Sequence, residues 1–198
     1  MMSGVIERTN VASRDALGTV FLDRDGTINE KAPEGDYVHR VEDLKLLEGA
    51  GAAIARLNHA GVRVVVVTNQ RGVALGLFSK EEVLKIEAAL VNMLAADGAR
   101  LDGIYFCPHD EGTCNCRKPL PGLFDQAQSD FPEIDPASSV MIGDSLSDIE
   151  FGRGLGMRTI FIEGPPERQR SGAKRARELA DMRARSLAEA VEYLLDRA

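Results

Sequence analysis

The chain has 198 residues, with 24 basic and 31 acidic side chains and a formal net charge of −7 at pH 7. The acidic balance, only 5 % aromatic residues and no tryptophan argue against nucleic-acid binding, which needs a basic face and stacking side chains. The apolar runs are far shorter than the ~20 residues of a membrane span, and the first residues lack the order of a secretory signal. We therefore expect a cytoplasmic protein, a monomer, with no nucleic-acid or membrane partner.

Short apolar runs alternate along the chain with stretches of helical periodicity. The β-branched run at 62–67 is typical of a strand covered on both faces, and capping-box patterns at Ser79 and Ser186 predict the starts of two helices. The basic stretch 167–185 is interpreted as a solvated helix or a mobile segment. We expect strands at 19–22, 62–67, 103–106, 140–142 and 159–162, and helices at 49–60, 79–96, 120–129, 146–155 and from about 186.

Strands that alternate with helices indicate βαβ units and a mostly parallel sheet. The fold class expected is therefore α/β, a Rossmann-like three-layer sandwich with a mostly parallel central sheet. Residues 1–17 are polar and mixed, and we expect a flexible N-terminal arm there, followed by a single domain over 18–198.

Polar side chains follow several of the predicted strands, and in an open parallel sheet such positions meet at one edge. They are Asp23 and Asp25, Thr68 and Asn69, Arg117 and Lys118, and Asp144 with Asp148. Three carboxylates that share one edge, Asp23, Asp25 and Asp144, repel one another unless a cation lies between them. Oxygen ligands of this kind suit Mg²⁺.

A carboxylate beside a hydroxyl, a cation and a metal is suited to phosphate chemistry. Asp23 is the candidate nucleophile, which attacks phosphorus to form an aspartyl-phosphate. Asp25 is the candidate acid and base, which protonates the leaving oxygen and then activates water. Thr68 and Lys118 are placed to bind the phosphoryl oxygens, where a positive charge offsets the repulsion between two anions.

All three cysteines of the chain lie within ten residues and enclose a histidine. Cys107, His109, Cys114 and Cys116 give the pattern Cys-x-His-x₄-Cys-x-Cys, whose three thiolates and one imidazole indicate a closed structural zinc site. Unligated cysteines in a loop are the alternative. Because Cys116 directly precedes Arg117 and Lys118, a zinc-stapled loop over 107–116 would hold both cations toward the phosphate.

The motif Asp23-Arg24-Asp25-Gly26-Thr27 resembles the first signature of the haloacid-dehalogenase-like phosphohydrolases. Thr68-Asn69-Gln70 is similar to their second motif, Lys118 to their third, and Gly143-Asp144 through Asp148 to their fourth. The resemblance implies a magnesium ion held by Asp23, the backbone carbonyl of Asp25 and Asp144, with Asp148 in support. The short stretches between these motifs leave no room for a substantial cap domain, so a capless enzyme is expected.

The zinc loop followed by Arg-Lys-Pro is similar to two branches of this superfamily, the heptose bisphosphate phosphatases and the histidinol-phosphate phosphatases. The stretch from Tyr37 to Arg40 and the residues 72–78 resemble the heptose branch, which implies a phosphorylated sugar as substrate. Arg71 is either a solvated loop charge or, with Arg117, a clamp for a second anionic group. A binding protein that has lost catalysis is a further alternative. The candidate substrate contacts are Arg24, Tyr37, Asn69, Gln70, Arg71 and Arg117.

Overall fold

Six strands, all parallel, form one sheet in the order β3-β2-β1-β4-β5-β6 in the computed structural model, which describes residues 17–33, 35–164 and 171–196. The strands are β1 (Thr19–Leu22), β2 (Arg63–Asn69), β3 (Gly103–Cys107), β4 (Ser139–Gly143), β5 (Arg158–Ile162) and β6 (Met182–Ala184). The α-helices are α1 (Ala50–His59), α2 (Lys80–Ala96), α3 (Gly122–Asp130), α4 (Leu146–Leu155), α5 (Ala173–Leu179) and α6 (Leu187–Leu195). Three short 3₁₀ helices are η1 (Val41–Asp43), η2 (Arg71–Val73) and η3 (Pro136–Ser138).

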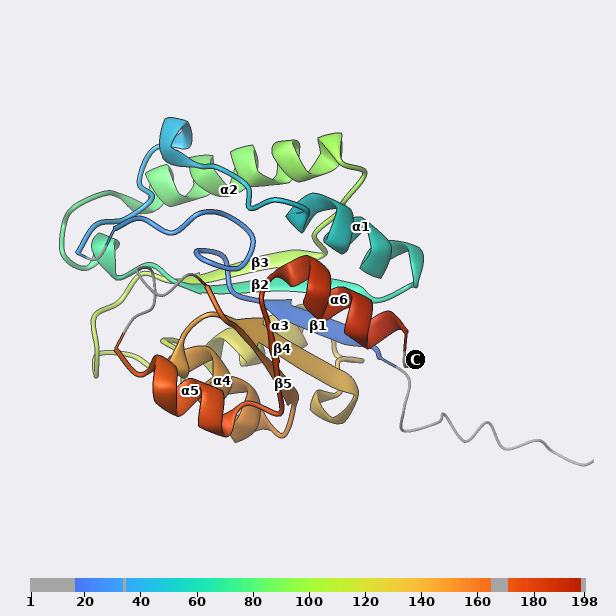
Figure 1. Cartoon of the computed structure of the whole chain (residues 1–198). Helices are drawn as coiled ribbons and strands as arrows, with labels where there is room; N and C mark the ends of the chain where they lie inside the picture. The colour runs from blue at the N-terminus through green and yellow to red at the C-terminus, as the bar shows by residue number, and fades with distance from the viewer. Residues whose placement is uncertain (1–16, 34, 165–170, 197–198) are drawn as a thin grey trace, which may run out of the picture.

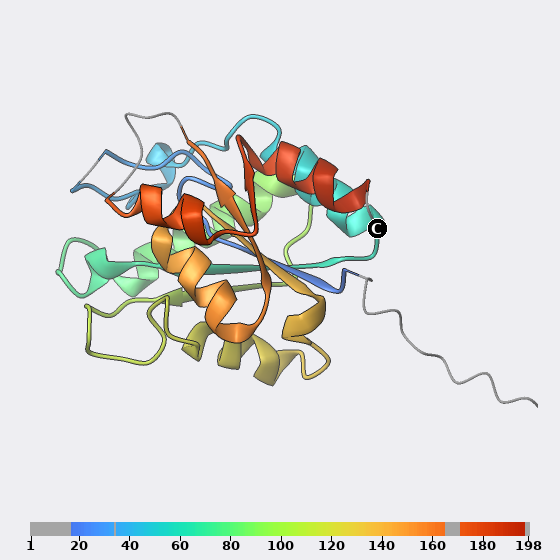
Figure 2. The same ribbon diagram turned by 60° about the horizontal axis from the view of Figure 1, so that its bottom comes forward.

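The helices cover the two faces of this sheet in separate layers, α1, α2 and α6 on one side and α3, α4 and α5 on the other (Figure 1). Successive residues of one strand serve opposite layers: Val20 and Leu22 pack in the core under α1, α2 and α6, whereas Phe21 packs against Phe124 of α3. Figure 2 shows the second layer from its own side. Both faces of the central strands are buried, which explains their continuous apolar runs.

The expected fold class is confirmed, and so are the expected strands and helices, within a few residues at their ends. The basic stretch is the exception, because its described part contains a buried helix residue and an additional strand. Ala176 of α5 is fully buried, and β6 pairs with β5 through Ile160, Phe161 and Ile162. The N-terminal arm lies outside the described residues except for Leu17, which packs against the core.

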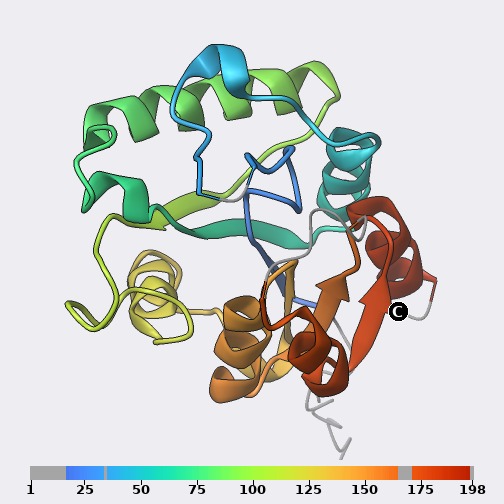
Figure 3. The same cartoon turned by 60° about the vertical axis from the view of Figure 1, so that its left-hand side comes forward.

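The loops that follow β1, β2 and β3 gather at the carboxyl end of the sheet, which Figure 3 brings forward. Between β1 and β2 the described residues form a loop, η1 and α1, and between β2 and Lys118 they form η2, α2, β3 and a loop. In residues 17–33 and 35–118 no further folded unit covers this edge. Within the described residues, the candidate site is therefore bounded by loops, strand ends and the start of α4.

Candidate active site

The polar residues that follow the strands do meet at one edge, where they line a cavity of about 190 Å³. β1 contributes Asp23 and Asp25 through the turn that ends it, β2 contributes Thr68, and β4 contributes Asp144. The cavity is also lined by Asn69, Arg117, Lys118 and Asp148.

The turn after β1 brings the backbone close to β4. The amide of Asp23 donates to the carbonyl of Ile142 at 2.9 Å, and the amide of Gly26 donates to Asn29 at 2.8 Å. Gly26 has φ +93°, and a Cβ there would lie 2.3 Å from a carboxylate oxygen of Asp144. Only glycine meets both demands, a left-handed conformation and a close approach. This residue therefore allows the first and fourth motifs to touch.

Lys118 is a buried cation between two carboxylates. Its ammonium is 2.9 Å from Oδ1 of Asp23 and 2.6 Å from Oδ1 of Asp148, and it donates to the carbonyl of Val67 at 2.6 Å. Burial alone would lower the pKa of Lys118, but the charges of Asp148 and Asp23 outweigh burial and raise it. The lysine is therefore charged at neutral pH, beside the candidate nucleophile.

Asn69 fixes the backbone of Lys118 on both sides. Its side-chain amide donates to the carbonyl of Lys118 at 3.1 Å and accepts from the amide of Lys118 at 3.0 Å. Asn69 therefore positions Lys118. Its expected contact with substrate stays a prediction.

The carboxylate of Asp25 is held by three neighbours. Arg24 donates from Nη2 at 2.8 and 3.1 Å and from Nε at 3.2 Å, Asn29 donates at 2.9 Å, and Gln70 donates at 3.0 Å. Burial would raise the pKa of Asp25, but the charge and hydrogen bonds of Arg24, with those of Asn29 and Gln70, hold it below its ordinary value. The arrangement favours the ionised carboxylate.

Two expected substrate contacts point elsewhere. The side chain of Arg24 is fully buried, with its guanidinium on Asp25, which gives it a positioning role, and its expected contact with substrate stays a prediction. Gln70 is also buried and donates to Thr68 at 3.0 Å as well as to Asp25. Both residues hold the acidic group, Arg24 through Nε and Nη2 and Gln70 through Nε2.

Three carboxylates, those of Asp23, Asp144 and Asp148, have ligand oxygens within 4.8 Å of one another. Burial raises the pKa of Asp23 to about 7; Lys118 opposes this shift, and the charges of Asp148, Asp144 and Asp25 add to it. Carboxylates forced together in this way are the hard oxygen ligands that Mg²⁺ prefers. The oxygens of Asp23 and Asp144 fit such an ion, whereas Asp148 is committed to Lys118 and to the cap of α4.

The cysteine cluster is also assembled. Sγ of Cys116 is 3.1 Å from Sγ of Cys107, 3.4 Å from Sγ of Cys114 and 3.2 Å from Nδ1 of His109. All four ligand atoms lie within 4.8 Å of one another, and the cysteines form no disulfide. Three sulfurs and one nitrogen at this spacing match the donor set of a tetrahedral zinc site.

The rim of the cavity is lined by Tyr37, Arg71 and Arg117. Arg71 is paired with Asp110 of the cysteine loop, Nε to Oδ1 2.6 Å, and both side chains are 40 % exposed. Tyr37 packs edge-on against Phe78, with ring centroids 5.6 Å apart. The rim thus carries both basic and aromatic side chains.

Sequence reasoning gave no site role to three polar residues at or near the site, Lys31, Asn29 and Glu87. Lys31 pairs with Asp144, Asn29 donates to Asp25, and Glu87 of α2 is buried near Arg24. Burial raises the pKa of Glu87 to about 7 against the opposing charge of Arg24. Of the three, only Asn29 could be suspected from the sequence, because it lies next to the first motif. Lys31 and Glu87 act on residues that are distant in sequence.

The family described as HAD-hydrolase-like matches residues 115–190. A protein of Yersinia pestis is 39 % identical over 161 residues, 76 % of this chain and 84 % of its own length, and one of Haemophilus ducreyi is 39 % identical over 184 residues, 88 % and 97 %. The chain therefore belongs to the HAD-like phosphatase family. Both of these relatives are named D-glycero-beta-D-manno-heptose-1,7-bisphosphate 7-phosphatase.

A relative from Mycobacterium tuberculosis is named for the alpha form of the same heptose bisphosphate and is 42 % identical over 137 residues, 69 % of this chain and 72 % of its own. Among solved structures, the D,D-heptose 1,7-bisphosphate phosphatase of B. bronchiseptica, complexed with magnesium and phosphate, superimposes with a TM-score of 0.80 at 31 % identity, covering 91 % of this chain and 99 % of that one. In residues 17–33, 35–164 and 171–196, no helix has the length and apolar character needed to cross a membrane.

Proposed function

We propose that this protein is a magnesium-dependent phosphatase that removes the 7-phosphate of D-glycero-D-manno-heptose 1,7-bisphosphate. The observation that carries the proposal is the ammonium of Lys118 at 2.9 Å from Asp23, at the cavity that the four motifs share. The names of relatives at 39–42 % identity support the substrate. Their names divide between the beta and alpha forms of the sugar, so the anomer is left to the experiment.

In the first step, a carboxylate oxygen of Asp23 attacks phosphorus, and the bond between phosphorus and the sugar oxygen breaks. Asp25 gives a proton to that oxygen, which leaves as the sugar hydroxyl. Asp25 is ionised without substrate, and a phosphate dianion beside it favours its protonation because like charges raise a carboxyl pKa. Lys118 holds the charge of the phosphoryl oxygens as it develops.

In the second step, Asp25 is a carboxylate again and takes a proton from water, whose oxygen attacks phosphorus. The bond to Asp23 breaks and inorganic phosphate leaves. The hydrogen bonds from Arg24, Asn29 and Gln70 favour this ionised form. The same neighbours that disfavour the acid in the first step therefore support the base in the second.

Mg²⁺ would be held by Asp23 and Asp144 together with the backbone carbonyl of Asp25, and it supplies positive charge that offsets the repulsion between phosphate and carboxylates. Zn²⁺ would be held by Cys107, His109, Cys114 and Cys116 and would stiffen the loop that leads into Arg117. At the rim, Arg117 and Arg71 supply forked donors for the second phosphate of a bisphosphate. Tyr37 supplies an apolar face for the sugar carbons.

The test is phosphate release over a small panel of substrates with Mg²⁺ present. We expect a heptose 1,7-bisphosphate, alpha or beta, to have the highest kcat/KM, above the heptose 7-phosphate and well above histidinol phosphate. A preference for histidinol phosphate would contradict the proposed substrate. Asp23→Asn should abolish turnover in a protein that stays folded, as circular dichroism checks, whereas Asp125→Asn, on the exposed face of α3, should leave turnover unchanged.

A further inference from the structure

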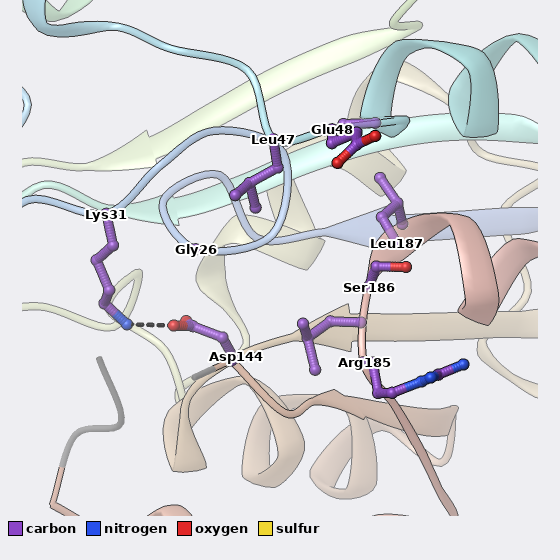
Figure 4. Close-up of a pocket in the computed structure, with 11 residues that line it drawn as sticks. Gly26, Lys31, Leu47, Glu48, Asp144, Arg185, Ser186 and Leu187 are labelled. Atoms are coloured by element: carbon purple, nitrogen blue, oxygen red, sulfur yellow. Dashed lines mark hydrogen bonds and ion pairs between the residues drawn. The ribbon is translucent and has the colours of Figure 1, made fainter. Parts of the chain in front are cut away.

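Lys31 is a buried cation at the site that none of the four motifs contains. Its ammonium is 2.5 Å from Oδ2 of Asp144, and the two side chains are only 8 % and 10 % exposed. Lys31 comes from the loop after β1 and Asp144 from the end of β4, and Figure 4 shows the two side chains pointing at each other. The fold therefore places an ammonium on a carboxylate that is expected to bind a metal.

This ion pair lies between two cavities. Lys31 and Asp144 both line the catalytic cavity, and both line a second cavity of about 200 Å³ bounded by Gly26, Leu47 and Leu187. Arg185 also lines this second cavity, but its guanidinium is engaged by Glu189, with Nε 3.0 Å from Oε2. Lys31 is thus the basic residue that faces Asp144 (Figure 4).

An ammonium and a magnesium ion compete for the same carboxylate. Both are hard cations that bind oxygen at short range, and a buried carboxylate is costly to leave without a positive neighbour. The ammonium of Lys31 already lies on Oδ2 of Asp144, so a magnesium ion that binds the same carboxylate meets a like charge and weakens that pair. An exchange of the two cations at Asp144 relieves this repulsion.

We propose that Mg²⁺ displaces the ammonium of Lys31 from Asp144, and that the released ammonium then binds the phosphate of the substrate. This inference rests on the proposed function in that it takes Asp144 as a magnesium ligand. Lys31 also lines the surface hollow beside Asp36 and Tyr37, next to the catalytic cavity. Its flexible four-carbon stem allows the charge to move there without a change in the backbone.

The exchange makes magnesium and phosphate binding depend on Lys31 in opposite directions. Without Lys31, Mg²⁺ meets no competitor and binds more tightly. Without Lys31, phosphate loses a cation and binds more weakly. A residue with a purely structural role would weaken both, so the opposite signs identify the exchange.

The experiment is calorimetric titration of Mg²⁺ into magnesium-free protein, followed by titration of inorganic phosphate into the magnesium-loaded protein. We expect Lys31→Met to tighten Mg²⁺ binding by about tenfold or more and to weaken phosphate binding by about tenfold, since close charge pairs couple strongly. Lys31→Arg keeps the charge and should return both affinities toward the original values. Lys85→Met, at an exposed lysine of α2, is the matched control.

Two results would overturn the exchange: magnesium affinity in Lys31→Met no higher than in Lys85→Met, or phosphate affinity unchanged by the loss of Lys31. The Tm of the magnesium-loaded variant checks that it is folded. Neither titration uses a heptose or measures hydrolysis. A failure here therefore leaves the proposed substrate standing, and a different preferred substrate leaves the exchange standing.

Discussion

The ammonium of Lys118 and Oδ1 of Asp148 lie 2.6 Å apart, and each side chain is only 1 % exposed. The other oxygen of Asp148 accepts hydrogen bonds from the amide and the hydroxyl of Ser145, at 3.0 and 2.6 Å, at the start of α4. Asp148 thus joins the catalytic cation to the cap of a helix. Its loss affects both the charge at the site and the stability of the fold.

We expect Asp148→Asn to lower kcat by roughly 10²-fold or more, because Lys118 loses one of its two carboxylates and shifts toward Asp23. The free energy of unfolding should fall by about 1.5–3 kcal/mol, the range for hydrogen bonds to charged groups. Steady-state kinetics and urea unfolding measure the two effects. Ser145→Ala should lose about 1 kcal/mol of stability through the cap with a much smaller loss of kcat. Equal kinetic losses in both variants would contradict the role given to the ion pair.

The raised pKa of Asp23 predicts a pH-dependent stability in the magnesium-free protein. In the folded chain this carboxyl keeps its proton up to pH about 7, whereas in the unfolded chain it loses the proton near its ordinary pKa of 3.8. The folded state then binds more protons in this window, so its contribution to stability falls as pH rises from about 4 to about 7. Urea unfolding without Mg²⁺ at several pH values should show this loss.

Asp23→Asn removes the titrating group and should flatten that part of the pH dependence. Added Mg²⁺ should restore stability most at the upper end of the window, where the carboxylate is ionised, and its affinity should fall below pH 7. Parallel pH profiles for the wild-type protein and Asp23→Asn would show that the loss arises elsewhere.

We expect the buried guanidinium of Arg24 to position Asp25. The dependence of the turnover rate on the leaving group tests this role. Arg24→Met should slow turnover of an alkyl phosphate by roughly 10²-fold, the lower end for a general acid. Release of p-nitrophenol from p-nitrophenyl phosphate in the first turnover should slow much less, because that leaving group needs no proton. Rapid-mixing absorbance measures the first turnover.

Glu87→Gln is the matched control for Arg24→Met, since Glu87 is buried near Arg24 and is not one of the three groups that hold Asp25. Its first-turnover rates should remain near the wild-type values for both substrates. If Arg24→Met slowed both leaving groups equally, Arg24 would act on the fold as a whole and not on the acid.

Loss of zinc is expected to raise KM more than it lowers kcat. The cysteine loop carries Asp110, which holds Arg71, and leads directly into Arg117. Cys114→Ser should therefore reduce bound zinc below one per chain, measured by mass spectrometry, and raise KM for the bisphosphate several-fold. Asp110→Asn, which leaves the four ligands in place, should keep its zinc and raise KM less. A fall in kcat alone would contradict the loop's role in holding the rim.

The fold, and the meeting of the site residues at one edge of the sheet, could be predicted from the sequence because each depends on local patterns. β-branched runs such as the one in β2 and the capping box at Ser79 define their own elements, and parallel strands bring their carboxyl ends together. β6 was not predicted, since its three residues lie in a stretch rich in arginine and alanine, which favour helices. Its pairing with β5 outweighs that preference.

The positions of individual side chains were harder to predict. Arg24 lies between two acidic residues in an exposed-looking turn, yet the turn directs its side chain into the core, where it binds Asp25. Lys31 is one lysine in a polar loop, and its partner is 113 residues away. Nothing local distinguishes Lys31, because its partner is set by the packing of the loop after β1 against the end of β4. The partner of Arg24 is its neighbour, but the burial of Arg24 depends on the packing of the turn.

The bridge between Asn29 and Leu46 closes the loop that carries Lys31 and Tyr37. Because the loop is tied at its base and forms no part of the sheet, adding or removing residues within it changes the entropy of closure only slowly with length. Variation in this loop can therefore alter ligand preference while the strands that deliver the reacting carboxylates stay in register. Natural or laboratory evolution of new selectivity in this scaffold would start most readily between those two residues.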